Sequence, residues 1–210
     1  MSGASGAAYG VRLLEVLLAA DRAVHLTISP SFAAVYQQEL GTPLGLQSFD
    51  VLSMLIGFAE WRERLAGQRT TPKFKLSKDQ LARVTYAPHQ DLMQPIASGS
   101  FLTGGMVVCP CSGSTMAAIA HAQGTNLLHR AAEVHLKERR KLILVPRETP
   151  LSLPQLENMR AATLAGAVIL PASPGFYHGA AGIMDLVDFV VARICDQLGV
   201  PHTLMRRWGE

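Results

Sequence analysis

The chain has 210 residues, of which 49% are hydrophobic and 17% charged, and its formal net charge is +3. This length and composition favour one ordered domain over residues 1–210 and exclude a disordered chain. The net charge is weak support for nucleic-acid binding, and we expect no such partner. No apolar run reaches the ~18 residues that span a bilayer, and the first residues lack a signal-peptide pattern, so we expect a cytoplasmic protein with no membrane partner.

The first half of the chain predicts helices around short strands. In chain order we expect a helix over 9–20, a strand over 24–28, helices over 31–40 and 46–65, and a strand over 81–86. The first strand is short and β-branched and ends at Ser29, before a proline. The polar segment 66–78 has no clear periodicity.

The second half alternates more regularly between apolar runs and helical patterns. We expect strands over 106–110, 142–146 and 167–171, and helices over 114–139, with a break at Gly124, over 153–164 and over 184–198. Each strand is a nearly continuous apolar run, as in parallel strands that are covered on both faces. The alternation predicts an α/β fold with a doubly wound parallel sheet.

Polar residues follow each of these three strands, which end at Pro110, Pro146 and Pro171. Proline donates no ladder hydrogen bond, so we expect strand pairing to stop there. Ligands of open α/β sheets bind outside the carboxyl ends of the strands, so the loops that follow are expected to converge at one edge. Ser29 ends a further strand at that edge.

Two loops rich in glycine and serine each open a helix, at Gly3-Ala4-Ser5-Gly6 and at Ser112-Gly113-Ser114-Thr115. Free backbone N–H groups and the positive end of a helix both favour a bound anion. A tight turn with a serine cap is the alternative for the first loop, which matches neither a dinucleotide-binding nor a P-loop motif. A basic cluster between 130 and 147 indicates either a solvated helix end or a site for a small phosphorylated ligand.

The cysteines and histidines give little sign of a reactive or metal-binding centre. Cys109, Cys111 and Cys195 are too few and too poorly spaced for a disulfide framework or a zinc site, and 109–111 is most simply a buried strand end. A redox role is the minority interpretation. The seven histidines show no spacing typical of a metal site.

Several longer segments carry a family resemblance. They are GASGAAYGVRLLEVL, PIASGS, VVCPCSGST, HRAAEVHLKERRKLILVPRETP, LENMRAA, GAVILPASPGFYH and DLVDFVVARICDQLG. Together they resemble the UbiX-type flavin prenyltransferases over residues 3–40 and 93–210, whereas 41–92 matches poorly. The resemblance implies a flavodoxin-like, Rossmann-like fold in three αβα layers and a homo-dodecamer. It also implies an enzyme that joins a dimethylallyl group from dimethylallyl monophosphate to N5 and C6 of reduced FMN, and so supplies prenylated FMN to UbiD-type decarboxylases.

The resemblance also assigns roles to residues. FMN would be bound by Gly3, Ala4, Ser5, Ser29, Ser112, Gly113, Ser114, Thr115 and Arg147. The prenyl phosphate would meet Lys137, Arg147, Tyr177 and Arg193, with Arg130 close by. Glu39 and Glu148 match the catalytic carboxylates, and Ser5, Lys137 and Tyr177 are further catalytic candidates. Trp208 matches an aromatic lid on a C-terminal tail, about 199–210, that reaches a neighbouring subunit, and 93–100 resembles a flexible segment near the substrate.

The residues agree with this chemistry. An allylic ester ionises to a cation and a phosphate, so the enzyme must stabilise the departing phosphate. The chain has no DDxxD motif that would hold Mg²⁺ for this purpose. Asp185 and Asp188 form an ordinary polar helix face. Fixed cations and a tyrosine hydroxyl can stabilise a monophosphate leaving group, so we expect no metal. Glu148 or the released phosphate is a plausible base for the proton lost from C6, and an ion pair with Arg147 is the alternative role of Glu148.

Two departures from the family are visible. No apolar strand precedes Gly3, so neighbouring strands would present unpaired edges in the core. We therefore expect that translation begins upstream. We also expect that this chain alone folds poorly or binds FMN weakly. Leu92 also stands near the place of a family tryptophan.

A decarboxylase of the cysteine-peptide type and a non-catalytic FMN carrier are the alternative functions. The decarboxylase served, and the choice between ubiquinone synthesis and aromatic-acid breakdown, stay open.

Overall fold

A computed structural model of the protein describes residues 1–67, 76–207 and 209. The helices are α1 (Ala7–Ala19), α2 (Pro30–Leu40), α3 (Val51–Leu65), α4 (Lys78–Leu81), α5 (Gly113–Ala120), α6 (Leu127–Lys137), α7 (Leu153–Leu164) and α8 (Ile183–Leu198), with a short 3-10 helix η1 (Pro95–Ala97). The strands are β1 (Val24–Leu26), β2 (Val84–Tyr86), β3 (Met106–Cys111), β4 (Leu142–Pro146) and β5 (Val168–Ile169). None of the helices in the described part of the chain is long and apolar enough to cross a bilayer.

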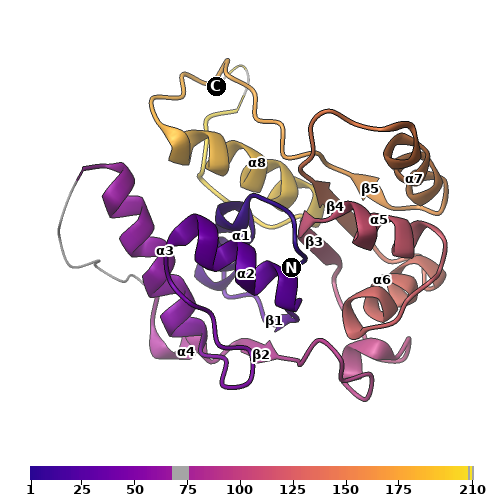
Figure 1. Ribbon diagram of the computed structural model, residues 1–210. Coiled ribbons are helices and arrows are strands. Elements are labelled where there is room, and N and C mark those ends of the chain that lie inside the picture. Colours follow the sequence, from indigo (N-terminus) through magenta and orange to yellow (C-terminus); the bar gives the residue numbers. More distant parts are fainter. Residues whose placement is uncertain (68–75, 208, 210) are drawn as a thin grey trace.

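All strand pairs are parallel, and helices cover both faces, as the sequence predicts (Figure 1). The central strand β4 shows the layering, because its side chains alternate between two cores. Ile143 and Val145 pack in the core shared with α1, α2, α3 and α8, whereas Leu142 and Leu144 pack in the core formed with α5, α6 and α7. The result is a three-layer αβα arrangement.

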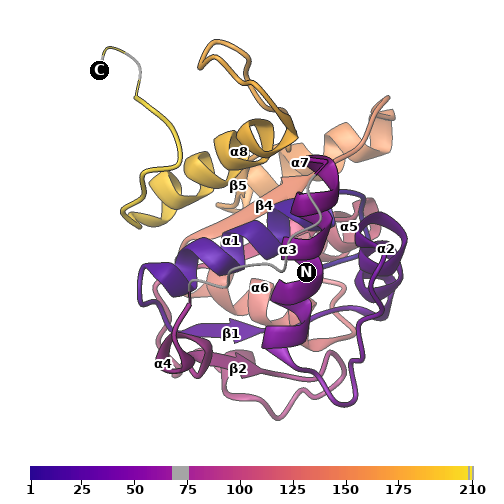
Figure 2. The same cartoon turned by 90° about the vertical axis from the view of Figure 1, so that its left-hand side faces the viewer.

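The strands form two separate sheets, ordered β1-β2 and β3-β4-β5. Figure 2 shows α1 extending above β1 and β2, with α8 on its far side. The two facing strands, β1 and β3, have no strand between them in the described residues. The expectation of unpaired strand edges in the interior is therefore confirmed, and the doubly wound sheet is interrupted at this point.

The first two residues connect the sheets at one end. The N–H of Ser29 donates to the carbonyl of Met1 at 3.1 Å, and the N–H of Ser2 donates to the carbonyl of Pro110 at 3.1 Å. These bonds hold the start of the chain between the ends of β1 and β3. The glycine-rich loop therefore begins at the carboxyl ends of the strands.

Two elements begin later than predicted, and each has a local cause. The helix expected from residue 46 begins at Val51, because the carboxylate of Asp50 accepts hydrogen bonds from the first turn and caps it there. The strand expected from residue 81 begins at Val84, because residues 78–81 form α4, which a capping box at Ser77 and Gln80 stabilises. The strands β1 and β5 are also shorter than expected.

The prediction that pairing stops at Pro110 is wrong. The strand β3 continues to Cys111, which pairs with Pro146, and its register shifts between Val108 and Cys111. The extra residue turns the peptide of Pro110 toward Ser2 instead of β4, so its missing N–H removes no bond from the β3–β4 ladder. The predicted break near Gly124 is confirmed, because α5 ends at Ala120 and Asn126 caps the start of α6.

Candidate functional site

A cavity of about 180 Å³ lies at the carboxyl ends of β3 and β4. Three of the predicted loops line it: Gly3 to Ser5, Ser112 and Gly113, and Arg147 and Glu148. The structure thus brings together residues that are separated by more than one hundred positions in the sequence. The convergence expected from the strand ends is confirmed for the loops after Pro110 and Pro146, whereas residues 172–177, after Pro171, do not line this cavity.

The N-terminus of α5 supplies anion-binding groups to this cavity. The hydroxyl of Ser112 accepts a hydrogen bond from Thr115 N–H at 3.3 Å and so caps the helix. It also lies 3.2 Å from the hydroxyl of Ser114 and donates to that of Thr115 at 3.0 Å. The first N–H groups of a helix have no intrahelical acceptor, so those of Gly113 and Ser114 can bind an anion, as the sequence predicts.

The N-terminus of α1 differs, because a carboxylate already covers it. Glu39 accepts hydrogen bonds from Gly6 N–H at 3.0 Å and from Ala7 N–H at 2.8 Å. An anionic cap stabilises this end of the helix dipole. Glu39, predicted to be a catalytic carboxylate, is therefore placed where it fixes the glycine-rich loop.

Close packing against Ser31 requires glycine at position 3. A Cβ at Gly3 would lie 2.3 Å from the Cβ of Ser31. Ser29, predicted to bind the flavin, is buried, and its hydroxyl caps α2 by accepting from Phe32 N–H at 3.1 Å. It does not line the cavity, and it supports the loop from behind through its bond to Met1.

Arg147 has an unsatisfied donor at this site. Its Nε atom is buried and has no hydrogen-bond partner. A buried donor without an acceptor is costly, and such a group is a sign of a missing ligand or water. Arg147 and Glu148 form no ion pair, so the alternative role suggested for Glu148 is not found.

The sequence missed several residues of this site. Ser2 connects the two glycine-rich loops, because its hydroxyl donates to the Pro110 carbonyl at 3.1 Å and accepts from Ser112 N–H at 2.9 Å. On α7, Gln155, Asn158 and Met159 line the cavity. The sequence could have indicated the residues on α7, because this helix directly follows the loop after β4. No sequence signal pointed to Ser2.

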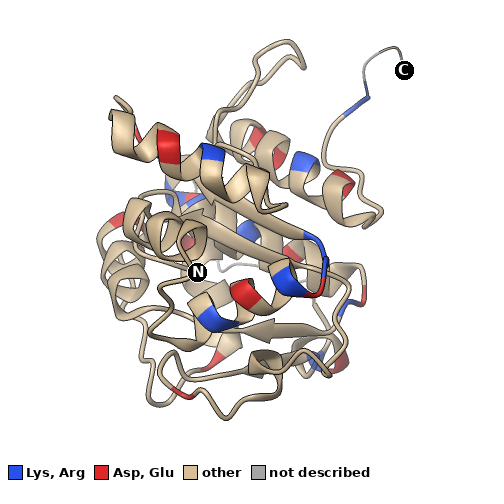
Figure 3. Ribbon diagram, turned by 90° about the vertical axis from the view of Figure 1, so that its right-hand side faces the viewer, with Lys and Arg blue, Asp and Glu red and all other residues tan. Residues whose placement is uncertain are grey.

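Apart from Arg147, the described residues predicted to bind the prenyl phosphate do not line this cavity within one chain. Lys137 ends α6 and forms an ion pair with Glu138, and Arg130 donates to the Ala97 carbonyl at 3.1 Å. Figure 3 shows how basic and acidic residues alternate along α6 and the turn after it. Arg193 lies on α8, where it pairs with Asp196 at 2.9 Å.

Tyr177 and Arg193 are nevertheless close to a common residue. The ring of Tyr177 packs against Phe189 with centroids 5.7 Å apart, and Phe189 and Arg193 line one shallow pocket beside β5. Tyr177 is 62% exposed. Trp208 lies outside the described residues.

The cysteines behave as core residues, which confirms the simplest interpretation of 109–111. All three are free and buried. Burial raises the pKa of Cys109 and of Cys111 to about 12, so both thiols stay protonated at neutral pH. In the described part of the chain, no group of three or more His, Cys, Asp or Glu side chains could hold a metal ion.

A three-layer α/β fold with an anion-binding cavity at its strand ends is the architecture of nucleotide-binding flavoproteins. The family model described as Flavoprotein matches residues 1–195, and the chain belongs to this family. The chain is 45% identical over 215 residues to the flavin prenyltransferase UbiX of Pseudomonas aeruginosa, an alignment that covers all of this chain and 92% of that protein. It is 42% identical to flavin prenyltransferase UbiX of Alkalihalophilus pseudofirmus, covering all of this chain and 94% of that one.

Two solved structures are also similar. One is AnUbiX (PadA1) in complex with FMN and dimethylallyl pyrophosphate, with a TM-score of 0.78, 34% identity, and coverage of 100% of this chain and 95% of that one. The other is a dodecameric FMN-dependent UbiX-like decarboxylase from Escherichia coli O157:H7, with a TM-score of 0.77, 35% identity and full coverage of both chains.

Proposed function

We propose that this protein is a flavin prenyltransferase, which joins the dimethylallyl group of dimethylallyl monophosphate to N5 and C6 of reduced FMN. The observation that carries the proposal is the 45% identity to a flavin prenyltransferase along the whole chain. The cavity at the strand ends supports it, because its donors suit the phosphate of a nucleotide.

The residues present fit FMN. The buried Nε of Arg147 lacks an acceptor, and Gly113, at the first turn of α5, lines the same cavity. Arg147 and the N-terminus of α5 would hold the phosphate, and the loop Gly3–Ser5 would approach the rest of the nucleotide. When bound, the reduced flavin supplies the two nucleophilic ring positions.

The chain's own cations would stabilise the departing phosphate. Lys137 and Arg193 carry fixed positive charge, and the hydroxyl of Tyr177 can donate a hydrogen bond. In the structure both cations are half-exposed and paired with carboxylates, at Glu138 and Asp196 respectively. A phosphate would compete for them with these weak surface pairs.

The separation of these groups from the cavity favours a site completed by neighbouring subunits. Lys137, Arg193 and Tyr177 do not line the cavity that contains Arg147. The similar Escherichia coli protein is described as dodecameric. We infer that this chain also forms a homo-oligomer in which α6 or α8 of one copy faces the cavity of another, and that the tail with Trp208 contributes a lid.

Glu148 is the proposed base. It lines the cavity beside Arg147 without pairing with it. A carboxylate in this position can accept the proton that leaves C6 during ring closure. A UbiD-type decarboxylase is the proposed recipient of the product, and a cytoplasmic location stays a prediction.

The test is an anaerobic incubation with reduced FMN and dimethylallyl monophosphate, followed by mass spectrometry of the flavin. A flavin heavier by one five-carbon unit is expected, with turnover unaffected by a chelator. Lys137→Gln and Arg193→Gln should each lower kcat by about 10²-fold, while Arg160→Gln, an exposed arginine on α7, should not. Unchanged FMN would indicate a carrier, and oxidative decarboxylation of a peptide with C-terminal cysteine would indicate the alternative enzyme.

A further inference from the structure

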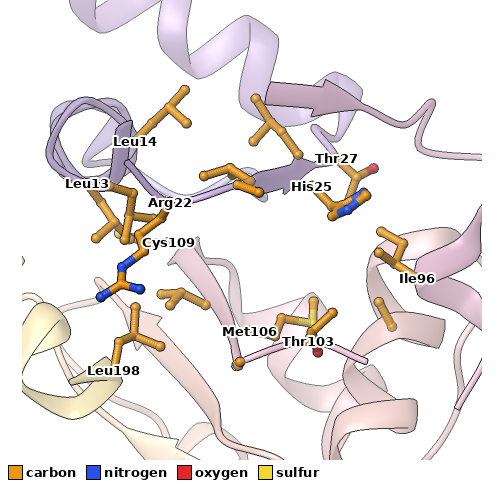
Figure 4. A pocket seen from close by; sticks show the side chains of 18 of the residues that line it. Leu13, Leu14, Arg22, His25, Thr27, Ile96, Thr103, Met106, Cys109 and Leu198 are labelled. Atoms are coloured by element: carbon orange, nitrogen blue, oxygen red, sulfur yellow. The ribbon is translucent and has the colours of Figure 1, made fainter. Parts of the chain in front are cut away.

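Residues 96–103, which we call the strap, lie against α6 and lead from η1 to β3. The strap begins with Ile96, which is buried against α6. It also lines a cavity of about 500 Å³ between β1 and β3. Figure 4 shows Ile96 and Thr103 around the same space as His25. Because the strap borders this cavity, apolar contacts alone hold it weakly, and polar contacts with α6 are needed to fix its position.

Arg140 supplies two of these polar contacts. Its Nη2 atom donates to the Gly99 carbonyl at 2.5 Å, and its Nη1 atom donates to the Phe101 carbonyl at 2.8 Å. A guanidinium holds its donors in a rigid fork, so this one side chain fixes the spacing of two carbonyls of the strap. Bonds from a charged donor are also stronger than bonds between neutral groups. Arg140 belongs to the basic cluster between 130 and 147, and its charge is directed at the strap.

Two further side chains bind the ends of the strap. Arg130 Nε donates to the Ala97 carbonyl at 3.1 Å. The buried ring of His135 has its Nε2 atom 2.8 Å from the Thr103 hydroxyl and its Nδ1 atom 2.7 Å from the Ala131 carbonyl. Since a carbonyl can only accept, Nδ1 carries the hydrogen of the neutral ring and Nε2 accepts from Thr103. Side chains of α6 and of the turn after it therefore bind the strap at every second residue from Ala97 to Thr103.

The strap also touches Lys137, the cation proposed to stabilise the departing phosphate. A Cβ at Gly99 would lie 2.7 Å from Lys137 Nζ and would also clash with the Glu138 carboxylate. The backbone at Gly99 is therefore packed directly against the Lys137–Glu138 ion pair. Because the Gly99 carbonyl is bound to Arg140, Gly99 connects the two basic side chains.

Lys137 depends on such a contact for a fixed position. Its side chain is half-exposed, and its pair with Glu138 lies on the surface, where ion pairs fix a side chain only weakly. A lysine side chain has many rotamers, and a cation stabilises the charge of a transition state best when it is already in place. A fixed strap excludes the rotamers that would pass through Gly99.

We propose that Arg140 is a positioning residue for this reaction: by binding the carbonyls of Gly99 and Phe101, it holds the strap against Lys137 and so fixes the ammonium group that stabilises the departing phosphate. In this role Arg140 touches neither the phosphate nor the flavin. The proposal rests on the proposed function, from which it takes the role of Lys137. Lysine at position 140 would restore only part of the effect, because an ammonium group does not hold two donors in a rigid fork.

The first test compares Arg140→Gln and Arg140→Lys with Arg139→Gln, which changes an exposed neighbouring arginine. Amide hydrogen exchange at residues 98–103 should be about tenfold faster in Arg140→Gln, less affected in Arg140→Lys, and unchanged in Arg139→Gln. Acetylation of Lys137 by acetic anhydride should be about threefold faster in Arg140→Gln, relative to the exposed Lys78, because the strap shields Lys137 less. Neither measurement requires turnover.

A double-mutant cycle then separates positioning from a general loss of structure. Arg140→Gln should lower kcat for flavin prenylation by about 10-fold, with unchanged affinity for FMN. In a Lys137→Gln background, the same substitution should change kcat by less than about twofold, because the cation that it positions is already absent. Gly99→Ala displaces Lys137 while Arg140 stays, so it should lower kcat to a similar extent, and it tests the same contact if Arg140→Gln does not fold.

Three outcomes would overturn the proposal. The first is unchanged exchange at residues 98–103 in Arg140→Gln. The second is an equal loss of kcat with and without Lys137, which would mean that Arg140 acts elsewhere. The third is an equal effect of Arg139→Gln, which would mean that positive charge alone suffices. If the wild-type protein does not prenylate FMN, the proposed function is wrong, whereas exchange and acetylation still decide whether Arg140 holds the strap against Lys137.

Discussion

The carboxylate of Glu39 accepts a hydrogen bond of 2.8 Å from the backbone N–H of Ala7, thirty-two residues away along the chain. The same carboxylate accepts from Gly6, so the side chain near the end of α2 determines where α1 begins. The N-terminus of α1 is thereby satisfied internally. Of the N-termini of α1 and α5, that of α5 is therefore the one that can bind the phosphate of a ligand.

Replacing Glu39 by Gln is expected to destabilise the fold. The amide keeps one acceptor but loses the charge that favours the helix N-terminus, so the free energy of unfolding should fall by about 1–2 kcal/mol. Urea unfolding measures this, with Glu60→Gln, an exposed carboxylate on α3, as the control. Equal stability of the two variants would mean that Glu39 does not hold the loop. A loss of turnover without a loss of stability would instead support a catalytic role.

Replacing Arg147 by Gln should weaken FMN binding by about 10–100-fold, because a charged donor to the phosphate is lost. The stability of the ligand-free protein should change little, since the buried Nε has no partner to lose. Flavin fluorescence titration measures the affinity, and Arg160→Gln is the matched control. Retained affinity in the Arg147 variant would show that the flavin binds elsewhere.

The close packing of α1 on β3 depends on Gly10. A Cβ at this position would lie 2.5 Å from the backbone carbonyl oxygen of Cys109, so Gly10→Ala must separate the helix from the strand. The expected cost is about 1–3 kcal/mol of unfolding free energy. Gly104→Ala is the control, because no atom lies within 4 Å of a Cβ there. A Gly10 variant as stable as this control would contradict the packing.

The amino group of Met1 predicts a pH dependence of stability. Burial lowers its pKa from 8.0 to about 6, so between pH 8 and 6 the unfolded chain binds more protons than the folded one. Stability should therefore fall as the pH drops through this window, by about 2–3 kcal/mol, and this contribution should level off below pH 6. The facing thiols of Cys109 and Cys111, with pKa values of about 12, stay neutral throughout.

An N-terminally acetylated chain is the control for this effect. It keeps His89, His129 and His135, whose pKa values burial also lowers and which titrate with the same sign at lower pH. The difference between the acetylated and free chains in chemical unfolding at several pH values isolates the amine. Parallel pH profiles would show that the amine is not buried in the folded protein.

Asp196 attaches the segment after α8 to that helix. Its carboxylate accepts from His202 at 3.1 Å and from Arg207 at 2.9 Å, and it also pairs with Arg193. Asp196→Asn should release residues 202–207 and increase trypsin cleavage at Arg206 and Arg207 by about tenfold. Asp79→Asn, on the exposed face of α4, serves as the control. An unchanged cleavage rate would mean that other contacts hold this segment.

The local elements of the protein could be predicted because their signals are local. The break between α5 and α6 follows from Gly124 and the cap at Asn126, and the apolar runs of β3 and β4 identify strands covered on both faces. The burial of Cys109 and Cys111 follows from the same runs. Errors occurred at Asp50 and Pro110, where a cap and a shift in register depended on geometry that periodicity does not contain.

Sequence alone determined that the loops at 112–113 and 147–148 would meet, because parallel strands place their carboxyl ends at one edge. Only the tertiary structure decided that Glu39 caps α1, that Ser2 connects the two glycine-rich loops, and that the Nε of Arg147 is left without an acceptor. It also decided that a cavity separates β1 from β3. These relationships join residues that are distant in the sequence, and their contacts depend on how the layers pack, which no local pattern of residues specifies.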